Sequence, residues 1–397
     1  MTTRVRLRIT LALVGLAAGH AVAGPSPGPA MTVDRVVIVM RHGVRPPTKD
    51  PAMPASVTPE RWPAWPVAPG WLTPHGAQAV TALASSDRRY LMTAALLPAR
   101  GCPASGTVAI IADSDERTIA TAQAWARGLA PGCAIAIDHH PQGEQEPRFN
   151  PYHAGVTLDA ADANASVAAA IGPGGLAALD RQYRPLLARL DAILCPGTQA
   201  GCGVGGTPTG YVEARADARP KLRGALDQGS TAAQILLLEY ADGKPPAEIG
   251  WGRATPADIT TLSALHALEF RLLARPLPLA RANLALLTPI IARGLTTGDA
   301  RVTVISGHDT QVASLGGLLG LHWRVPGFAE DDPAPGGAII IERGHDAKGT
   351  RRLRARYRAQ PLDALRAGSG TAIVSPWVDI PCPESRSVEL CLAGAGG

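Results

Sequence analysis

Several common sequence signals are missing from this chain of 397 residues, and each absence argues against a class of protein. No apolar stretch is long enough to span a bilayer, so no transmembrane helix is expected. No run of lysines and arginines suggests nucleic-acid binding, and no Gly-x-x-x-x-Gly-Lys motif suggests a nucleotide-binding loop. Aromatic residues are scarce at 4%, but 46% hydrophobic and 18% charged residues are ordinary for a globular protein.

The cysteines also lack the Cys-x-x-Cys spacing of zinc sites, so no metal centre is expected on them. Six cysteines allow many disulfide connectivities, but bonds between neighbours are favoured because short loops cost the least chain entropy to close. Disulfides would indicate an oxidising compartment. The neighbouring pairs are Cys102 with Cys133, Cys195 with Cys202, and Cys382 with Cys391.

Residues 1–23 have the features of a secretory signal peptide. Three arginines within residues 1–8 precede an apolar stretch at 9–18, and Ala21-Val22-Ala23 provides the small residues of a cleavage site. A membrane anchor is the alternative, but the apolar stretch is too short to span a bilayer. We therefore expect a periplasmic or secreted protein. Cleavage removes the three arginines and lowers the formal net charge from +5 to +2, which does not suggest a polyanion-binding protein.

Hydrophobic patterning predicts an α/β fold with a mostly parallel sheet and flanking helices. Predicted strands are 36–39, 106–112, 134–137, 301–305, 338–342 and 352–357, of which the last two are expected to be antiparallel. Predicted helices are 76–97, 118–129, 174–194, 218–242, 256–273, 283–293 and 310–319, with a weaker pattern from 160 onward. Asn283 is expected to cap the start of its helix.

The stretch from 145 to 275 contains almost no strand signal. We therefore predict an α/β domain made of residues 24–144 and 276–397, with a helical domain, 145–275, inserted into it. Residues 195–210 are rich in glycine and are expected to form an irregular excursion closed by their own cysteine pair.

Three predicted strands end in residues that are suited to phosphate chemistry. The carboxyl ends of parallel strands meet at one edge of a sheet, so these residues can lie together although they are distant in sequence. Each alone has an ordinary explanation, such as a structural histidine, a solvated arginine or a helix cap. Their joint occurrence favours a shared site. They are Arg41, His42 and Arg45 after the strand at 36–39, Arg117 after the strand at 106–112, and His308 and Asp309 after the strand at 301–305.

This set of residues predicts phosphoryl transfer without a metal or another cofactor. Arginines and an imidazole can bind a phosphoryl group and the charge of its transition state. His42 is the candidate nucleophile, and nearby cations would keep its imidazole unprotonated below neutral pH. Asp309 is the candidate acid for the leaving alkoxide. That role needs a protonated carboxyl, which predicts activity at acid pH.

The motif Arg41-His42-Gly43-Val44-Arg45-Pro46-Pro47-Thr48, together with His308-Asp309-Thr310, resembles the histidine acid phosphatases. The Arg-His-Gly part alone is less specific, because phosphoglycerate mutases share it. The resemblance extends over about residues 33–392, and its further segments are similar to the bacterial periplasmic branch of phytases and glucose-1-phosphatases. These segments are 62–67 (WPAWPV), 70–74 (GWLTP), 115–118 (DERT), 149–151 (FNP), 250–253 (GWGR) and 335–337 (PGG).

The resemblance implies a phosphoglycerate-mutase-like α/β domain with a helical lid and a site between them. It also implies disulfides within the three neighbouring cysteine pairs. The implied roles are His42 as nucleophile, Asp309 as proton donor, Arg41, Arg45, Arg117 and His308 as ligands of the scissile phosphate, and Thr48 and Lys49 as contacts to the rest of the substrate.

The forms Val44-Arg45 and Asp309-Thr310 favour a phytase, and Lys49 would add positive charge for a multiply phosphorylated ring. Gln234 lies where phytase relatives carry an acidic residue, so it is either a neutral substrate contact or a surface glutamine. We expect a monomer that acts on phytate or a sugar phosphate, without nucleic-acid or membrane partners. Alternatives are a glucose-1-phosphatase, a broad-specificity acid phosphatase, a mutase, and a periplasmic phosphate-binding protein.

Overall fold

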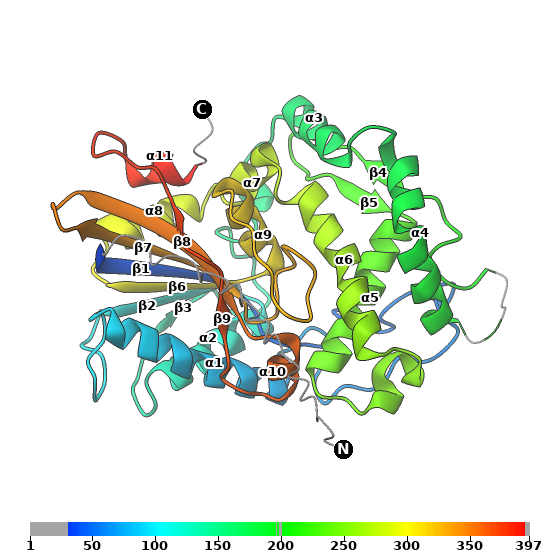
Figure 1. Cartoon of the computed structure of the whole chain (residues 1–397), viewed down its shortest axis with the longest axis horizontal. Helices are drawn as coiled ribbons and strands as arrows, with labels where there is room; N and C mark the ends of the chain where they lie inside the picture. The colour runs from blue at the N-terminus through cyan, green and yellow to red at the C-terminus, as the bar shows by residue number, and fades with distance from the viewer. Residues whose placement is uncertain (1–30, 196, 198–200, 394–397) are drawn as a thin grey trace, which may run out of the picture.

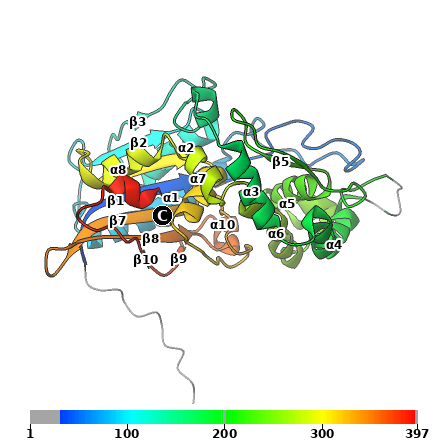
Figure 2. The same cartoon turned by 90° about the horizontal axis from the view of Figure 1, so that it is seen from above.

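The computed structural model describes residues 31–195, 197 and 201–393. The predicted signal peptide, residues 1–23, lies outside the described residues. A sheet with flanking helices occupies one end of the long axis, and the helices α4 to α6 occupy the other (Figures 1 and 2). None of the described helices is long and apolar enough to cross a membrane.

Eight strands of the described chain form the main sheet, in the order β10-β8-β7-β1-β6-β2-β3, with β9 paired to β8. The central strands β1, β6, β2 and β3 are parallel, and the strands beyond β1 on the other side are antiparallel, so the predicted fold class is confirmed. The strands are β1 (Met31–Arg41), β2 (Val108–Ala112), β3 (Ile137–Asp138), β6 (Val302–Gly307), β7 (Ala338–Asp346), β8 (Arg351–Ala359), β9 (Ile373–Val374) and β10 (Val378–Asp379).

The apolar run in β1 is buried on both faces, as expected for a central strand. Val37 and Val39 pack with the core that includes α8 and α9, whereas Val36, Ile38 and Met40 pack with the core between the sheet and the helices α1 and α2. This alternation follows from the two-residue period of a strand. Figure 1 shows α8 and α11 above the sheet and α1 and α2 below it.

The helices around the sheet include the predicted ones at 76–97, 118–129 and 310–319, each within a few residues of its predicted bounds, and two short ones that were not predicted, at 362–366 and 388–392. They are α1 (Pro74–Thr93), α2 (Glu116–Leu129), α7 (Leu277–Asn283), α8 (Thr288–Thr296), α9 (Asp309–Leu318), α10 (Leu362–Arg366) and α11 (Val388–Leu392). Thr73 caps α1 by accepting a hydrogen bond from the Gly76 N–H group, and Pro74 occupies the first turn, where its missing N–H group costs nothing.

The remaining elements lie between α2 and α7 in the sequence. They are α3 (Ala160–Ile171), α4 (Gly175–Leu194), α5 (Ala225–Ala241), α6 (Pro256–Leu273), the hairpin strands β4 (Gly210–Val212) and β5 (Lys221–Arg223), and the short helices η1 (Pro151–Ala154) and η2 (Pro246–Gly252). One apolar core continues from the upper face of the sheet into α4, α5 and α6. The division into two domains at 145 and 275 stays a prediction.

Two predicted helices are wrong in part. The helix predicted at 218–242 begins only at Ala225, because residues 221–223 form β5, whose Leu222 is buried between two exposed cations. The helix predicted at 283–293 is two helices: Asn283 ends α7 rather than capping a start, and α8 begins at Thr288 with Pro289 in its first turn. Strands of three residues carry too little periodicity to be recognised in the sequence.

All three neighbouring cysteine pairs are disulfide-bonded, as predicted: Cys102–Cys133, Cys195–Cys202 and Cys382–Cys391. The first disulfide joins the segments that lead into β2 and β3. The last disulfide joins Cys382, which follows β10, to Cys391 in α11. The sequence pattern did not predict the helix α11.

Candidate active site

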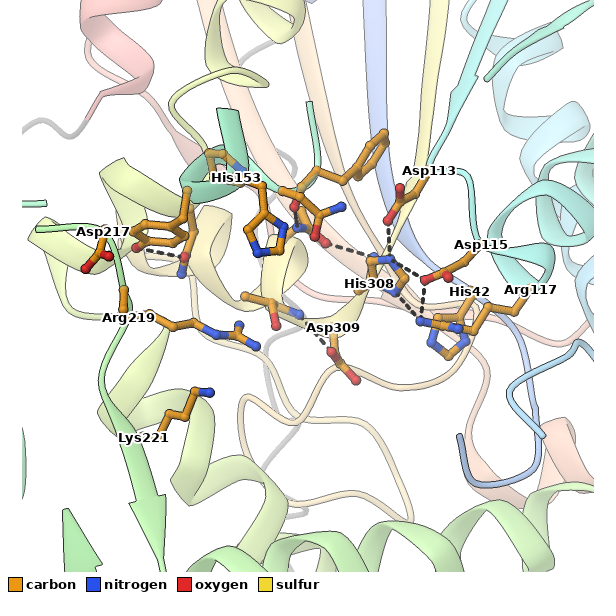
Figure 3. A pocket seen from close by; sticks show the side chains of 18 of the residues that line it. His42, Asp113, Asp115, Arg117, His153, Asp217, Arg219, Lys221, His308 and Asp309 are labelled. Atoms are coloured by element: carbon orange, nitrogen blue, oxygen red, sulfur yellow. Dashed lines mark hydrogen bonds and ion pairs between the residues drawn. The ribbon is translucent and has the colours of Figure 1, made fainter. Parts of the chain in front are cut away.

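The sheet register brings the three predicted strand ends to one edge. Arg41 at the end of β1 pairs with Gly307 at the end of β6, and Ala112 at the end of β2 pairs with Ser306. The His42 N–H group continues this register by donating a hydrogen bond of 2.9 Å to the Gly307 carbonyl. The residues that follow these strands line a cavity of about 520 Å³ (Figure 3).

The His42 imidazole is fixed in one orientation and one tautomer. It is 1% exposed, and its Nδ1 atom lies 2.8 Å from the Gly43 carbonyl, which can only accept a hydrogen bond. Nδ1 therefore carries the proton, and the lone pair is on Nε2. Burial, together with the charges of Arg117 and Arg45, holds the pKa of His42 well below its usual range. The imidazole is therefore unprotonated in mildly acid solution.

The three predicted arginines surround His42 but differ in their contacts. Arg41 is buried, donates a hydrogen bond of 2.5 Å to the Pro333 carbonyl, and places Nη2 3.1 Å from Asp309 Oδ2. Arg117 donates to Asp115 Oδ2 at 2.5 Å. Arg45 lines the cavity and, within the described chain, forms no ion pair. Burial and the nearby Arg117 and Arg41 lower its pKa to about 9, so it remains charged in acid and neutral solution.

His308 is the N-cap of α9 and faces the cavity beside His42. Its Nε2 atom lies 2.6 Å from Asp113 Oδ2 and 3.5 Å from Asp115 Oδ2. Its Nδ1 atom lies 3.5 Å from Arg117 Nη2. The carboxylate of Asp113 is buried directly after β2 and fixes the imidazole. No role was predicted for Asp113, although its place at a strand end is the same signal that identified the arginines.

Asp309 begins α9 and lines the same cavity as His42 (Figure 3). Its Oδ1 atom accepts a hydrogen bond from the Thr310 N–H group, and its Oδ2 atom faces Arg41. Burial alone would raise the pKa of the carboxyl, but Arg41, His266 and other nearby cations outweigh burial and hold it well below its usual range. The carboxyl is therefore ionised before substrate binds, whereas the predicted acid role needs a proton.

Another histidine, His266, lies close to Asp309. The Nε2 atom of His266 lies 3.9 Å from Asp309 Oδ2, and its Nδ1 atom lies 2.7 Å from Asp332 Oδ1. Both His266 and Asp332 are buried. This pair was not predicted, because His266 occupies the middle of α6 and Asp332 lies in a loop before β7. A histidine within a helix is usually a core residue.

Thr48 and Lys49 do not line the cavity that contains His42. They line an adjoining cavity of about 720 Å³, which shares Arg45 and Asp309 with the first cavity. Gln234 of α5 lines this adjoining cavity and is 7% exposed, with both amide atoms unpaired among the described residues. The alternative that it is a surface glutamine is therefore wrong.

Among the described residues, one group has the composition of a metal site: Asp113, Asp115 and His308, whose ligand atoms lie within 4.8 Å of one another. The acids of this group already contact the imidazole of His308 and the guanidinium of Arg117. The arrangement is explained by these internal contacts, and the expectation of a reaction without metal stays a prediction.

Comparison with known proteins relates this arrangement to a family. Residues 32–174 match the model of the histidine phosphatase superfamily (branch 2). Phytase AppA of Escherichia coli is 38% identical over 341 residues, which cover 79% of this chain and 77% of the relative. The glucose-1-phosphatase of Salmonella typhimurium is 30% identical over 358 residues, which cover 87% of this chain and 85% of the relative.

Solved structures give the same result. The structure of Hafnia alvei phytase in complex with myo-inositol hexakis sulphate superposes with a TM-score of 0.80 at 29% identity, and the match covers 93% of this chain and 98% of that chain. The paired motifs, the strand-edge geometry and similarity over most of the length agree. The chain belongs to the histidine phosphatase superfamily and is a phosphatase that hydrolyses phosphomonoesters.

Proposed function

We propose that this phosphatase is an exported phytase, which removes phosphate from myo-inositol hexakisphosphate through a phosphohistidine intermediate on His42. One observation carries this proposal. The imidazole of His42 is held unprotonated, with Nε2 free, among three arginines that can bind a phosphoryl group.

The arginines and His308 bind the scissile phosphate in this proposal. Guanidinium groups present planar pairs of donors that match the oxygen atoms of a phosphate, and their charge stabilises the transition state of phosphoryl transfer. Arg45 and Arg117 line the cavity directly. Arg41 is held by its hydrogen bond to the Pro333 carbonyl and by its ion pair with Asp309. The Asp113 carboxylate orients His308 toward the same space.

In the first step, His42 Nε2 attacks phosphorus in line with the ester oxygen. The N–P bond forms as the P–O bond breaks, and the ester oxygen leaves with its electron pair and takes the proton of Asp309. In the second step, water attacks phosphorus and gives a proton to the Asp309 carboxylate. The N–P bond breaks, and inorganic phosphate and the free imidazole are restored.

Asp309 must gain its proton when the substrate binds, since nearby cations keep the free carboxyl ionised. A phosphate dianion beside Arg41 and Arg45 offsets their positive charge and therefore raises the pKa of the carboxyl. Acid solution favours this protonation, so the expected acid activity applies to the enzyme–substrate complex.

Further observations support phytate as the substrate and an exported location for the enzyme. Relatives are named phytase and glucose-1-phosphatase, and the two adjoining cavities leave room beyond the phosphate position, where Lys49 adds positive charge. The three disulfides fit an oxidising compartment such as the periplasm. That the enzyme is a monomer stays a prediction.

Rates on phytate, glucose 1-phosphate and an aryl phosphate, measured across acid pH with a chelator present, test the proposal. A phytase shows its highest kcat/KM on phytate in acid solution and is unaffected by the chelator. A higher kcat/KM on glucose 1-phosphate would support the alternative of a glucose-1-phosphatase. Loss of activity in the chelator would contradict the reaction without metal.

A further inference from the structure

The cavity that contains His42 has a second positively charged wall. Arg219, which precedes β5, and Lys221, its first residue, line the same cavity as His42. In Figure 3 these two side chains come from the side opposite to His42 and Arg117, and Asp309 lies between the two groups. The β4–β5 hairpin thus places two cations across the cavity from the predicted nucleophile.

These two cations have no acidic partner among the described residues. The acids that line the cavity are engaged elsewhere: Asp217 contacts Arg215 at 3.5 Å, Asp115 contacts Arg117, Asp113 contacts His308, and Asp309 contacts Arg41. Both Arg219 and Lys221 are exposed. A guanidinium that lines a cavity without a counter-charge is suited to an anion from solution.

Arg219 also lines the adjoining cavity, together with Lys49 and Gln234. The space beyond the scissile position is therefore bordered by Arg219, Lys221 and Lys49. A phosphate monoester with a small neutral alcohol would occupy only the end near His42. A ring that carries several phosphates can reach both walls at once.

We infer that Arg219 and Lys221 form a second phosphate subsite, which binds a non-scissile phosphate of a multiply phosphorylated ring. The inference rests on the proposed function, since it concerns how the enzyme recognises that class of substrate. The subsite selects for polyanionic substrates and positions the ring while a different phosphate lies at His42.

The test compares the double variant Arg219→Ala/Lys221→Ala with the control Arg223→Ala. Arg223 is exposed on the same strand but lines neither cavity. The ratio of kcat/KM on phytate to kcat/KM on an aryl phosphate should fall by about 10- to 100-fold in the double variant, because two charge-assisted contacts are lost. In the control, the ratio should change by about twofold at most. A double variant with the same ratio as the control would overturn the subsite.

A second measurement separates this inference from the proposed function. Myo-inositol hexakis sulphate cannot be hydrolysed at phosphorus, and its inhibition of aryl phosphate turnover reports binding alone. Its inhibition constant should rise about tenfold or more in the double variant. An equal constant in the double variant and control would overturn the subsite. If the wild-type enzyme hydrolyses aryl phosphate but not phytate, the phytase proposal fails, and the inhibition constants still decide the subsite.

Discussion

The two walls of the active-site cavity differ in how their side chains are held. At the strand edge, His42, Arg41 and Asp309 are fixed by buried contacts to the backbone or to one another. On the hairpin, Arg219 and Lys221 have no ion-pair partner among the described residues. The first wall is preorganised for one reaction, and the second is free to adjust to the substrate. Under the proposed function, chemistry and substrate choice are therefore located in different parts of the fold.

The strand-edge wall achieves its reactivity through burial. Removing charged groups from water is unfavourable unless each group is paired, and here Arg41 pairs with Asp309 and Asp113 pairs with His308. Burial and the charges of Arg117 and Arg45 favour the unprotonated form of the His42 imidazole. Substitutions in each wall can separate the roles of the two walls or show that they act as one site.

The largest loss is expected for His42→Ala. Without the nucleophile, turnover of every phosphomonoester should fall by on the order of 10⁴-fold or more, whatever its size or charge. Steady-state rates on phytate and on an aryl phosphate measure this loss. The exposed His139→Ala serves as the control for loss of a histidine. Turnover of the aryl phosphate that survives in His42→Ala would contradict the role of His42 as nucleophile.

Asp309→Asn should have a large effect that depends on the leaving group. Phytate and alkyl phosphates need a proton on the departing oxygen, so their rates should fall by roughly 10²- to 10³-fold. Activated aryl phosphates depend less on this proton, so their rates should fall by about tenfold or less. A plot of rate against leaving-group pKa measures the difference. Equal losses on both classes would count against Asp309 as the acid.

Arg45→Gln should change the pH profile rather than only the rate. The pKa of His42 is lowered by burial and then by Arg117 and Arg45. Removing a cation favours the protonated imidazole and raises this pKa, so the acid limb of kcat/KM should move to higher pH by on the order of one pH unit. Arg219→Ala should leave that limb in place. If Arg45→Gln and Arg219→Ala shift the acid limb equally, the charges of both walls act on His42 to the same extent.

Glu239→Gln should have the smallest effect on turnover and a clear effect on stability. Glu239 in α5 is fully buried and accepts a hydrogen bond from the Gly250 N–H group. Burial raises the pKa of its carboxyl to about 8. Since the folded state holds the proton more tightly than the unfolded state, its stabilising contribution is complete below about pH 4.5 and is lost as pH rises toward 8.

The isosteric glutamine removes this pH dependence. At pH 8 the variant should therefore have a higher free energy of unfolding than the wild type, by on the order of 1 kcal/mol or more. Near pH 4 the two proteins should differ little. Denaturant unfolding at both pH values measures this, with Glu248→Gln, which is partly exposed, as the control. An equal difference at both pH values would show that folding leaves the pKa of the Glu239 carboxyl unchanged.

The same comparison explains what could be predicted from the sequence. The strand-edge residues were predictable, because apolar runs mark the strands and parallel strands end at one edge. Thr48 and Lys49 border the adjoining cavity, and their contact with the substrate stays a prediction. Parts of the site that depend on how distant helices pack, such as His266 with Asp332, have no local signal.

The hairpin wall was hidden for a different reason. The stretch from 218 onward has helical composition, which predicts Arg219 and Lys221 on the surface of a helix. In the structure they belong to a short hairpin that turns them toward the active-site cavity. Strand pairing between Lys221 and Val212 decides this placement, and pairing partners are not visible in the pattern of a three-residue strand.

The central claim is that His42 carries the phosphoryl group during the reaction. Rapid acid-free quenching of the enzyme with a radiolabelled phosphate ester, followed by peptide mapping, tests it most directly. The account predicts label on the peptide that contains His42, stable in base and lost in acid, and no label in His42→Ala. Label on another residue, or wild-type turnover under the same conditions with no labelled enzyme at any quench time, would contradict it.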